Sequence, residues 1–489
     1  MERCTKIETP TAIVLLGATG DLARKKLLPA LMDLFEKGVL PNHFHILAFS
    51  RDTMTSEEYR SFARTHIAAK GHSHTPTQLD AFLSTIEYIQ GLFDEKEGFA
   101  RIKQALNTYD ESIGMCTSKL FYLAVPPNFY DTIFEQLAVT ELDQPCIVGE
   151  GWTRILVEKP FGSDLNNAHH LEDKMSVLFR EEQIYRIDHY LAKDALQNIL
   201  AFRFSNVLFE DNWNKNYIEA VYIKLFENFD VANRGAFFDG VGALRDVGQN
   251  HMLQMLTLIA MGNPETLDAA HLRKRRAEIL QALRLPSKED VGTNIIKGQY
   301  SGYREVKNVA PDSMTETYFA LKTFVDTDQW QGVPFYLEHG KATSTSVSEI
   351  TVRFRSSKYC VCGSHEPHDH PNFVQFSISP EQKIVVRFWV RKPGLKYELE
   401  PNDLVFDRAQ PTNSSGTAVT EAYEEVLFDA ICGDQTLFVS NAEQAAAWTY
   451  ITSILDLWHS TEPMSYARGS DGPDSSLKKE IHDHLQLLT

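Results

Sequence analysis

The sequence predicts two domains of different fold class: a doubly wound α/β domain, followed by an α+β domain with a large, mostly antiparallel sheet flanked by helices. The chain has 489 residues, which is more than one hydrophobic core usually serves. Short apolar runs alternate with helical patterns in the first part, whereas strand-like segments follow one another in the second. We therefore place the border near Asp188, between a domain over residues 1–188 and a domain over residues 189–489.

In the first domain the apolar runs have the length and composition of buried parallel strands. The run TAIVLL (11–16) predicts the first strand, and the segment after Gly20 predicts a helix that ends at Gly38. Further strands are predicted at HFHILAFS (43–50), KLFYLAV (119–125) and TRILVEKP (153–160). Strands that alternate with helices in this way form a doubly wound sheet.

In the second domain many segments alternate apolar and polar residues, which is typical of antiparallel strands with one solvated face. Strands are predicted at 216–227, 316–326, 348–357, 373–379 and 383–391. Helices are predicted at 240–261, 267–284 and 420–432, and an exposed loop at 410–418.

The composition excludes several classes of function. The formal net charge is −18 and no basic stripe is present, so we expect no nucleic-acid partner. The apolar runs are too short for a spanning helix, and the start MERCTKIETP lacks the apolar core of a secretion signal, so we expect no membrane association. The six cysteines are too sparse for a disulfide framework, which is typical of the reducing cytoplasm.

The stretch IVLLGATGDLA joins the first strand to the first helix through a glycine turn. Gly17 and Gly20 let the backbone approach a ligand that a β-carbon would block, and the helix N-terminus offers N–H groups to a pyrophosphate. The spacing lacks the first glycine of the full dinucleotide fingerprint, where Leu15 stands. A tight turn without a ligand would have the same pattern, but its place at the first strand of an alternating domain favours a Rossmann-like coenzyme site.

The end of the second strand distinguishes the two nicotinamide coenzymes. An arginine there suits the 2′-phosphate of NADP, whereas an acidic residue suits the ribose hydroxyls of NAD. The strand ends in Ser50 and is followed by Arg51, which favours NADP. Asp52, one residue later, keeps NAD as the alternative.

The stretch YRIDHYLAKD mixes an acid, a base and cations. Asp188 stands at the N-cap position of a predicted helix, and His189 and Lys193 are four residues apart, so they would share a helix face. Together with Tyr190 they would form an anion cradle at a helix start. A capped helix with a solvated face is the alternative interpretation of the same residues.

Two further segments carry reactive side chains. In LRDVGQNHMLQMLTLIAM, Asp246 and His251 lie at the start of an otherwise apolar helix, which indicates that this end opens into a cleft. Histidine is a natural general base near neutral pH, and a carboxylate can hold its imidazole in place. Lys159 follows the fourth strand, and ligands of open α/β sheets bind beyond the carboxyl ends of the strands.

Taken together, these segments resemble the glucose-6-phosphate dehydrogenase family over nearly the whole chain. The resemblance runs through GATGDLARKKLLPAL, AFSR, YIQGLFDEKEGF, LFYLAVPP, VEKPFG, YRIDHYLAK, RDVGQNH, KGQYSGY and GVPFYLEHGK. It implies an NADP-dependent oxidoreductase of carbohydrate metabolism that oxidises glucose 6-phosphate to 6-phosphogluconolactone, the first step of the oxidative pentose phosphate pathway. It also implies a cytoplasmic homodimer or homotetramer that assembles through the large sheet.

The resemblance implies a role for each matching residue. The coenzyme would be bound by Gly17, Thr19, Gly20, Asp21, Leu22, Arg51, Gly91, Leu92, Ala124, Pro126 and Lys159. The sugar phosphate would be bound by Lys159, His189, Tyr190, Lys193, Glu227, Asp246 and Lys341. His251 would take the proton from the anomeric hydroxyl, and Asp188 would orient His251 and stabilise its charge.

Two positions depart from the family pattern. Ala192 replaces a usual glycine, which gains up to ~1 kcal/mol of helix propensity but adds a methyl group. Ser346 stands where the family usually has a second cation, and because the loss of a charged hydrogen bond costs ~1.5–3 kcal/mol, we expect weaker sugar-phosphate binding. These departures leave two alternatives: a dehydrogenase of another aldose phosphate, and a catalytically silent NADP-binding regulator.

The segment YCVCGSHEPHDHP (359–371) has no counterpart in the resemblance. A zinc set could be drawn from Cys360, Cys362, His365, His368 and His370. Because C-x-C is less usual than C-x-x-C in zinc sites, we favour a plain surface hairpin and predict no metal.

Overall fold

The computed structural model describes residues 6–71, 74–145, 151–357, 370–407 and 421–486. The chain divides into two compact units. The first unit consists of Met1–Ala192, Thr266–Arg273 and Ala418–Ala445, and the second of Lys193–Glu265, Lys274–Thr417 and Ala446–Thr489. Two later segments thus belong to the first unit, so the predicted single border near Asp188 does not separate the two units completely.

The first unit is built on a seven-stranded sheet. Its strands are β1 (Thr11–Leu16), β2 (Phe44–Ser50), β3 (Ile86–Gln90), β4 (Ser118–Leu123), β5 (Thr153–Val157), β6 (Ile184–Ile187) and β15 (Phe438–Val439). The strand order is β15-β6-β5-β4-β1-β2-β3, and every pair is parallel except β15 with β6. The order reverses between β1 and β4, so the carboxyl ends of these two strands form the switch point at which such sheets bind ligands.

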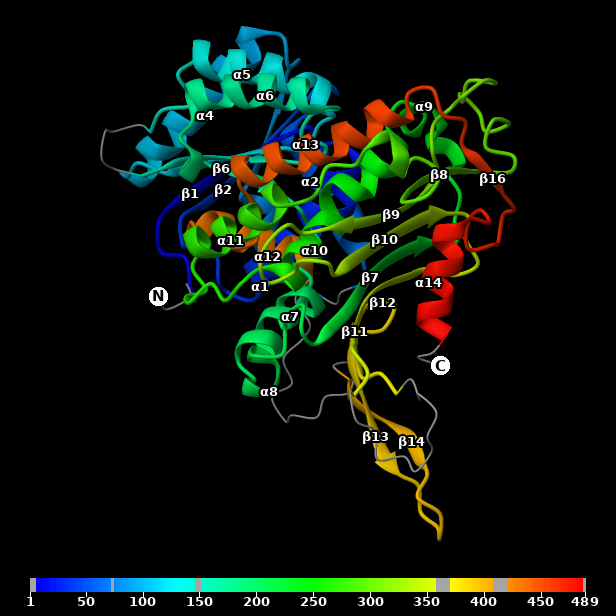
Figure 1. Cartoon of the computed structure of the whole chain (residues 1–489). Coiled ribbons are helices and arrows are strands. Elements are labelled where there is room, and N and C mark those ends of the chain that lie inside the picture. Colours follow the sequence, from blue (N-terminus) through cyan, green and yellow to red (C-terminus); the bar gives the residue numbers. More distant parts are fainter. Residues whose placement is uncertain (1–5, 72–73, 146–150, 358–369, 408–420, 487–489) are drawn as a thin grey trace. The chain divides into compact units, whose positions relative to one another are not determined.

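Helices cover both faces of this sheet and make it a doubly wound fold (Figure 1). One face packs against α4 (Lys96–Ile113), α5 (Tyr130–Val139) and α6 (Leu165–Leu178). The other packs against α1 (Leu28–Glu36), α2 (Ser56–Ala68), α3 (Pro76–Ser84) and α12 (Ala422–Cys432). Short helical turns lie at η1 (Ala23–Leu27), η2 (Pro127–Phe129) and η3 (Glu181–Gln183). The strands are apolar throughout because both faces are buried.

The second unit is built on a nine-stranded sheet. In spatial order its strands are β14 (Leu399–Asp407), β13 (Lys383–Arg391), β12 (Phe373–Ser379), β11 (Val347–Phe354), β7 (Ile218–Glu227), β10 (Pro334–Lys341), β9 (Tyr318–Phe324), β8 (Ile295–Tyr300) and β16 (Met464–Tyr466). The pairs β10–β7 and β16–β8 are parallel and the others antiparallel. The predicted mostly antiparallel sheet is therefore confirmed.

The remaining helices belong to the second unit or cross between the units. The second unit contains α7 (Asp194–Phe204), α8 (Val207–Glu210), η4 (Ala232–Arg234), α9 (Gly235–Phe238), η5 (Leu244–Met252), α10 (Leu253–Ala260), η6 (Lys288–Asp290) and α14 (Ser476–Gln486). Two helices, α11 (Ala269–Gln281) and α13 (Asn441–Trp458), contain residues of both units.

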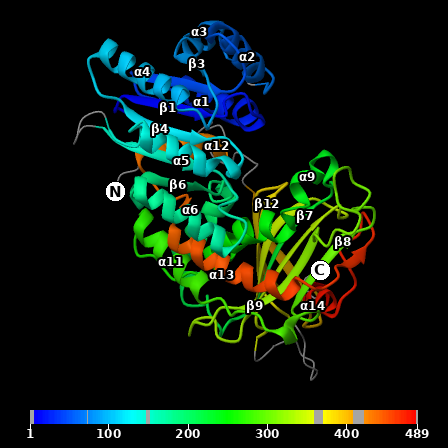
Figure 2. The same cartoon turned by 90° about the horizontal axis from the view of Figure 1, so that it is seen from above.

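The two faces of the large sheet have different partners because side chains alternate along each strand. Gly248 of η5 lies against Phe319 of β9, so η5 covers the face that carries His339 and Lys341 of β10. On the opposite face α14 lies over the sheet, where Tyr336 donates a hydrogen bond to Glu480 (Figure 2). Helix η5 thus covers the sheet face that carries charged site residues, and α14 covers the opposite face, which carries none of the predicted site residues of β10.

The strand and helix predictions agree with these elements, with two kinds of difference. Strands β3, β6, β8, β10, β14, β15 and β16 were not predicted. The helix after the glycine turn ends near Gly38 as predicted, but it starts with the π-helical turn η1. The predicted loop at 410–418 lies outside the described residues.

Two further sequence expectations concern cysteines and membranes. Cys116 is disulfide-bonded, so the expectation of a reducing environment is wrong for this residue, whereas Cys432 forms no disulfide. Among the described helices, none has both the length and the apolar character needed to span a membrane.

Candidate active site

The glycine turn lies at the switch point of the first sheet and fits a dinucleotide. Gly17 has φ +89°, and a β-carbon there would lie 2.6 Å from the carbonyl oxygen of Ala124. The turn is held by hydrogen bonds from the Gly17 and Ala18 N–H groups to Phe49, and by Tyr59, whose hydroxyl donates to Ala18. The backbone is thus exposed to a ligand at a place where no side chain would fit, and the first turn of η1 follows with its N–H groups.

Asp21 and Leu22 begin that first turn. The Asp21 carboxylate is exposed and pairs with Lys25 at 2.8 Å and with Arg24. Hydrogen bonds from Lys25 and Arg24 lower the pKa of Asp21. These two cations lie one turn into the helix, where they add positive potential beside the glycine turn.

The end of β2 supports the choice of NADP. The Thr19 hydroxyl lies 2.7 Å from the Ser50 hydroxyl and donates to the Asp52 carboxylate. Asp52 is therefore hydrogen-bonded to the glycine turn. Arg51, which lies between Ser50 and Asp52 in the chain, is exposed at the carboxyl end of the strand. A guanidinium in this position suits the 2′-phosphate of NADP.

Two more strand ends contribute to the predicted coenzyme site. Gly91 follows β3, and a β-carbon there would lie 2.6 Å from the Phe49 ring, while Leu92 beside it is 42% exposed. Ala124 follows β4 and its N–H donates to Leu16 at 2.9 Å, which places Ala124 and Pro126 beside the glycine turn. The residues of the first unit predicted to bind the coenzyme thus follow β1, β2, β3, β4 and β5 at one edge of the sheet.

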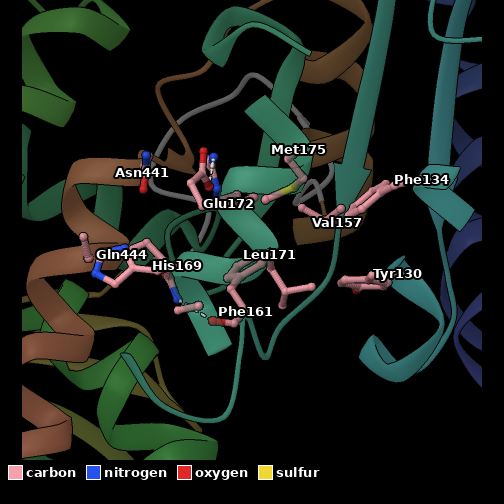
Figure 3. Close-up of a pocket in the computed structure, with 13 residues that line it drawn as sticks. Tyr130, Phe134, Val157, Phe161, His169, Leu171, Glu172, Met175, Asn441 and Gln444 are labelled. Carbon is pink, nitrogen blue, oxygen red and sulfur yellow. Dashed lines mark hydrogen bonds and ion pairs between the residues drawn. The ribbon is translucent and has the colours of Figure 1, made fainter. Parts of the chain in front are cut away.

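Lys159 follows β5, and the bond between Lys159 and Pro160 is cis. The loop that follows is braced by the first turn of α13, where the Gln444 side chain donates to the Phe161 carbonyl at 3.2 Å (Figure 3). Behind the loop lies a small cavity with room for about one water molecule. It is lined by Tyr130, Phe134, Val157, Phe161, Ala168, His169, Leu171, Glu172, Met175, Arg186, Asn441, Gln444 and Ala445. This cavity is too small for a ligand. The side chains that line it pack behind the loop.

The segment from Asp188 to Lys193 differs from the prediction. It is a turn, and α7 begins only at Asp194 with Lys193 as its N-cap residue, so His189 and Lys193 do not share a helix face. Within this turn the Asp188 side chain accepts a hydrogen bond from the Tyr190 N–H at 3.0 Å. Asp188 is 2% exposed, and His189 and Tyr190 are half-buried.

Asp246 and His251 lie on η5, which is a π-helix over its whole length. Hydrogen bonds from residue i+5 to residue i place Asp246 and His251 on the same face, whereas an α-helix would turn them about 140° apart. The Asn250 side chain explains the wider turn. It donates to the Asp246 carbonyl at 3.1 Å and accepts from the His251 N–H at 2.7 Å, so it inserts into the backbone ladder.

The N-terminus of η5 is fixed by a buried acid. Glu316 accepts a hydrogen bond from the Leu244 N–H at 2.9 Å, and Gly242, with φ +77°, has no room for a β-carbon beside this carboxyl group. Burial raises the pKa of Glu316. Since sequence patterns do not show which acid meets a helix start, Glu316 and Asn250 were missed as residues that position Asp246 and His251.

A second cluster links β7, β10 and η5. Lys341 pairs with Glu227 on the neighbouring strand and lies 3.5 Å from the Asp246 carboxylate. Three of the four residues predicted to bind the sugar phosphate in this unit are therefore together, the fourth being Lys193, and the Lys341 ammonium lies between two acids.

His339 lies beneath this cluster and was not predicted. It is fully buried, and its Nδ1 donates to the Leu225 carbonyl at 2.6 Å. Burial lowers the pKa of His339 to about 4, and the Lys341 charge acts in the same direction. His339 and Lys341 are two residues apart on β10, so their side chains lie on the same face of the sheet. This spacing is the sequence signal that could have identified His339.

The structure shows what surrounds Ala192 and Ser346, the two residues that depart from the family pattern. Ala192 is 1% exposed and belongs to the apolar core of the first unit, so its methyl group is accommodated. Ser346 donates to the Asn228 side chain at 2.7 Å and accepts from the Asn228 N–H at 2.9 Å. Asn228 follows Glu227 in the chain, but the exposed Ser346 brings no charge to the cluster.

The predicted hairpin with its candidate zinc set lies mostly outside the described residues. Of the residues named for it, His370 is described, and its ring lies 4.3 Å from that of Trp389 on β13. Cys360, Cys362, His365 and His368 fall in the part of the chain that the structure does not describe.

Comparison with known proteins places both units in one family. The family models "Glucose-6-phosphate dehydrogenase, NAD binding domain" and "Glucose-6-phosphate dehydrogenase, C-terminal domain" match residues 14–198 and 200–484. Among curated relatives, a glucose-6-phosphate 1-dehydrogenase of Borreliella burgdorferi is 35% identical over 481 residues, which is 96% of this chain and 97% of the relative. A cytoplasmic one of Arabidopsis thaliana is 36% identical and covers 96% of this chain and 91% of the relative.

Solved structures give the same result. A glucose-6-phosphate dehydrogenase in complex with its substrate glucose-6-phosphate matches with a TM-score of 0.89 and 30% identity, over 98% of both chains. The enzyme of Mycobacterium avium matches with a TM-score of 0.82 and 29% identity, over 97% of this chain and 98% of the other. The chain belongs to the glucose-6-phosphate dehydrogenase family.

Proposed function

We propose that this protein oxidises glucose 6-phosphate to 6-phosphogluconolactone with NADP, the first step of the oxidative pentose phosphate pathway. The observation that carries this proposal is the match of both units to one dehydrogenase family. The open glycine turn with Arg51 exposed at the end of β2 gives independent support for a phosphorylated dinucleotide.

When bound, the nicotinamide ring of NADP supplies the hydride acceptor. The backbone at Gly17 and Gly20 and the first turn of η1 would hold the pyrophosphate, and Arg51 would bind the 2′-phosphate. Lys159, on its braced loop, would lie between coenzyme and sugar.

We propose that His251 removes the proton from the anomeric hydroxyl. Its imidazole lies on the same face of η5 as Asp246, beside the cluster that contains Lys341, so base and sugar-binding residues come from one rigid frame. Asp188 is proposed as the carboxylate that orients His251 and stabilises the imidazolium as it forms. The lactone would form as the C1 hydride leaves and the proton passes to the His251 ring.

The sugar phosphate would be bound by three residues of the turn before α7. His189, Tyr190 and Lys193 are proposed to hold the phosphate group, as donors placed around an anion. Glu227, Asp246 and Lys341 would bind the hydroxyl groups of the sugar, because two acids and one ammonium offer both acceptors and donors.

A steady-state assay tests the function directly. Purified protein is mixed with glucose 6-phosphate, other aldose phosphates and each coenzyme, and reduced nicotinamide is followed by absorbance. We expect turnover with glucose 6-phosphate and NADP. Preference for another sugar phosphate would favour the dehydrogenase of a different aldose, and coenzyme binding without any turnover would favour the silent regulator.

The His251→Asn variant tests the proposed base. Loss of a general base costs about 10²–10⁴-fold in rate, so we expect kcat to fall by this amount while NADP binding is retained. The matched control is His459→Asn, since His459 is exposed and outside the site. Normal turnover in His251→Asn would show that another group removes the proton.

We further infer that the protein forms a homodimer or homotetramer through the outer part of the large sheet. In Figure 1 the hairpin of β13 and β14 extends beyond the other strands of its sheet, and β14 is an edge strand. Phe388, Leu404, Val405 and Phe406 are exposed on this hairpin. An exposed apolar edge is a liability for a monomer, so a second copy is the proposed partner.

Light scattering coupled to gel filtration measures the assembly. We expect at least a dimer for the unmodified protein and a smaller species for Phe406→Asp, while Val177→Asp on α6 serves as the exposed control. A monomer for the unmodified protein would contradict the inference.

A cytoplasmic location is also proposed, since two Arabidopsis relatives are named cytoplasmic. Cell fractionation with an antibody to the protein would test this location.

A further inference from the structure

The turn that follows β2 is held from one side by side chains of β3. Tyr88 is 7% exposed, and its hydroxyl donates a bifurcated hydrogen bond to the main-chain carbonyls of Ser50, at 3.2 Å, and of Asp52. The Gln90 side chain donates to the carbonyl of Arg51 at 3.3 Å. The carbonyls of three successive residues thus accept hydrogen bonds from the neighbouring strand, which fixes the main chain on both sides of Arg51.

The same turn is held from the other side by the glycine turn. The Thr19 hydroxyl donates to the Asp52 carboxylate at 2.5 Å. It lies 2.7 Å from the Ser50 hydroxyl, and because the Thr19 proton is used by Asp52, the Ser50 hydroxyl is the donor of this second hydrogen bond. One side chain of the glycine turn therefore holds both neighbours of Arg51.

Two stacked rings join the turns behind these contacts. Tyr88 stacks on Tyr59 of α2, with ring centroids 5.0 Å apart and an angle of 19° between the rings. Tyr59 is fully buried, and its hydroxyl donates to the Ala18 carbonyl of the glycine turn at 2.9 Å. The turn after β1 and the turn after β2 are thus connected through a buried aromatic pair.

This arrangement matters because the turn carries a cation and an acid side by side. An acid at the end of this strand binds the ribose hydroxyls of NAD, whereas an arginine binds the 2′-phosphate of NADP. Arg51 is exposed, while Asp52 is half-buried and hydrogen-bonded to Thr19. Since both residue types are present, the conformation of the turn determines which of them meets the coenzyme.

We propose that Tyr88 and Thr19 set the preference for NADP over NAD. Tyr88 fixes the main chain so that Arg51 is presented to the 2′-phosphate, and Thr19 engages the carboxylate of Asp52 that the ribose of NAD would otherwise use. NADP as the coenzyme rests on the proposed function. Tyr88 is a positioning residue, because it acts on the coenzyme through Arg51.

The Tyr88→Phe variant tests the positioning role, since it keeps the ring and its stacking on Tyr59 but loses the hydroxyl. Binding of NADP and of NAD is measured by calorimetry without a sugar. We expect the dissociation constant of NADP to rise about 3- to 10-fold and that of NAD to change less than about twofold. An equal loss for both coenzymes would make Tyr88 merely structural, and unchanged binding of NADP would also overturn the proposal.

Two more variants separate this effect from general stability. Gln90→Leu removes a second bond to the turn at an exposed position, so we expect weaker NADP binding with NAD unchanged even if Tyr88→Phe does not fold. The matched control is Tyr109→Phe on α4. The Tyr109 ring is also stacked, 4.4 Å from that of His45, but His45 lies at the other end of β2 from Ser50. We expect Tyr109→Phe to bind both coenzymes normally, and a change in preference equal to that of Tyr88→Phe would refute the proposal.

Thr19→Val tests the second contact, because valine keeps the shape of the side chain and removes the hydroxyl. The released Asp52 carboxylate would accept hydrogen bonds from the ribose of NAD and repel the 2′-phosphate, so we expect NAD to bind about threefold tighter or better and NADP to bind more weakly. In Thr19→Val combined with Asp52→Ala the gain for NAD should disappear. Asp52→Ala alone should change NAD binding less than about twofold, because that carboxylate is already used by Thr19.

The outcomes for Asp52 are decisive in both directions. A gain for NAD that persists in the combined variant, or a strong loss of NAD binding in Asp52→Ala alone, would show that Thr19 does not act by holding Asp52. Absence of turnover with glucose 6-phosphate would refute the proposed reaction and would leave these binding results unaffected. Unmodified protein that binds NAD as tightly as NADP would overturn the inference, whether or not the sugar is oxidised.

Discussion

The substitution Ser346→Lys would restore the cation that family members usually carry five residues after the lysine that matches Lys341. A charge-assisted hydrogen bond to the sugar phosphate is worth ~1.5–3 kcal/mol, and the exposed Ser346 would give up its two hydrogen bonds with Asn228, together worth about 1 kcal/mol. Lys341 is already paired with Glu227 and Asp246, so repulsion between the two lysines is reduced. The net gain of about 0.5–2 kcal/mol corresponds to a KM for glucose 6-phosphate lowered about 2- to 30-fold.

The assay is steady-state kinetics at saturating NADP, with glucose 6-phosphate and with unphosphorylated glucose. Since the gain depends on the phosphate group, we expect no improvement with glucose. The matched control is Thr345→Lys, which adds the same charge at the neighbouring exposed position. An unchanged KM in Ser346→Lys, or an equal gain in Thr345→Lys, would refute the reasoning.

Three further predictions follow from the geometry of the site. Arg51→Ala removes the proposed 2′-phosphate contact, so we expect the KM for NADP to rise about tenfold or more while that for NAD changes little, as measured by steady-state kinetics; an equal effect on both coenzymes would place Arg51 elsewhere. Gly17→Ala would put a β-carbon 2.6 Å from the Ala124 carbonyl at φ +89°, so we expect loss of NADP binding in calorimetry and a lower melting temperature, whereas Gly38→Ala at φ +66°, which has open space around it, should keep NADP binding. His339 has a pKa lowered to about 4, so the unfolded chain binds a proton that the folded protein does not, and stability should fall by up to about 3 kcal/mol as pH drops from about 6.5 to about 4. In chemical denaturation across this range His339→Leu should show a weaker pH dependence, and an unchanged dependence would contradict the assignment.

The local elements of this protein follow from short-range patterns in the chain. Runs such as TAIVLL are apolar throughout because both faces of a parallel strand are buried, and the structure confirms a strand at Thr11–Leu16. The glycine turn was predictable for the same reason, since only a residue without a β-carbon fits at Gly17. The types of reactive side chain were also evident, because histidine, lysine and carboxylates are visible in any sequence.

The arrangement of those side chains depended on contacts that periodicity does not encode. The sequence pattern predicted an α-helix for LRDVGQNHM, but the Asn250 side chain inserts into the backbone ladder and makes η5 a π-helix. The predicted helix start at Asp188 is a turn, in which the Asp188 carboxylate accepts a hydrogen bond from the Tyr190 N–H. In both cases hydrogen bonds between a side chain and the nearby backbone accompany the difference from the predicted helix.

By itself, the sequence determined the fold class, the strand–turn–helix that suits a dinucleotide and the chemical groups available for catalysis. Only the tertiary structure decided which groups meet: Glu158 with Tyr122 and Tyr130, and Lys341 with Glu227 and Asp246. The physical reason is that strand and turn formation depend on residues next to one another in the chain. Partners drawn from different strands and helices are instead selected by packing, and packing also sets the burial that shifts the pKa of Glu158 and of His339.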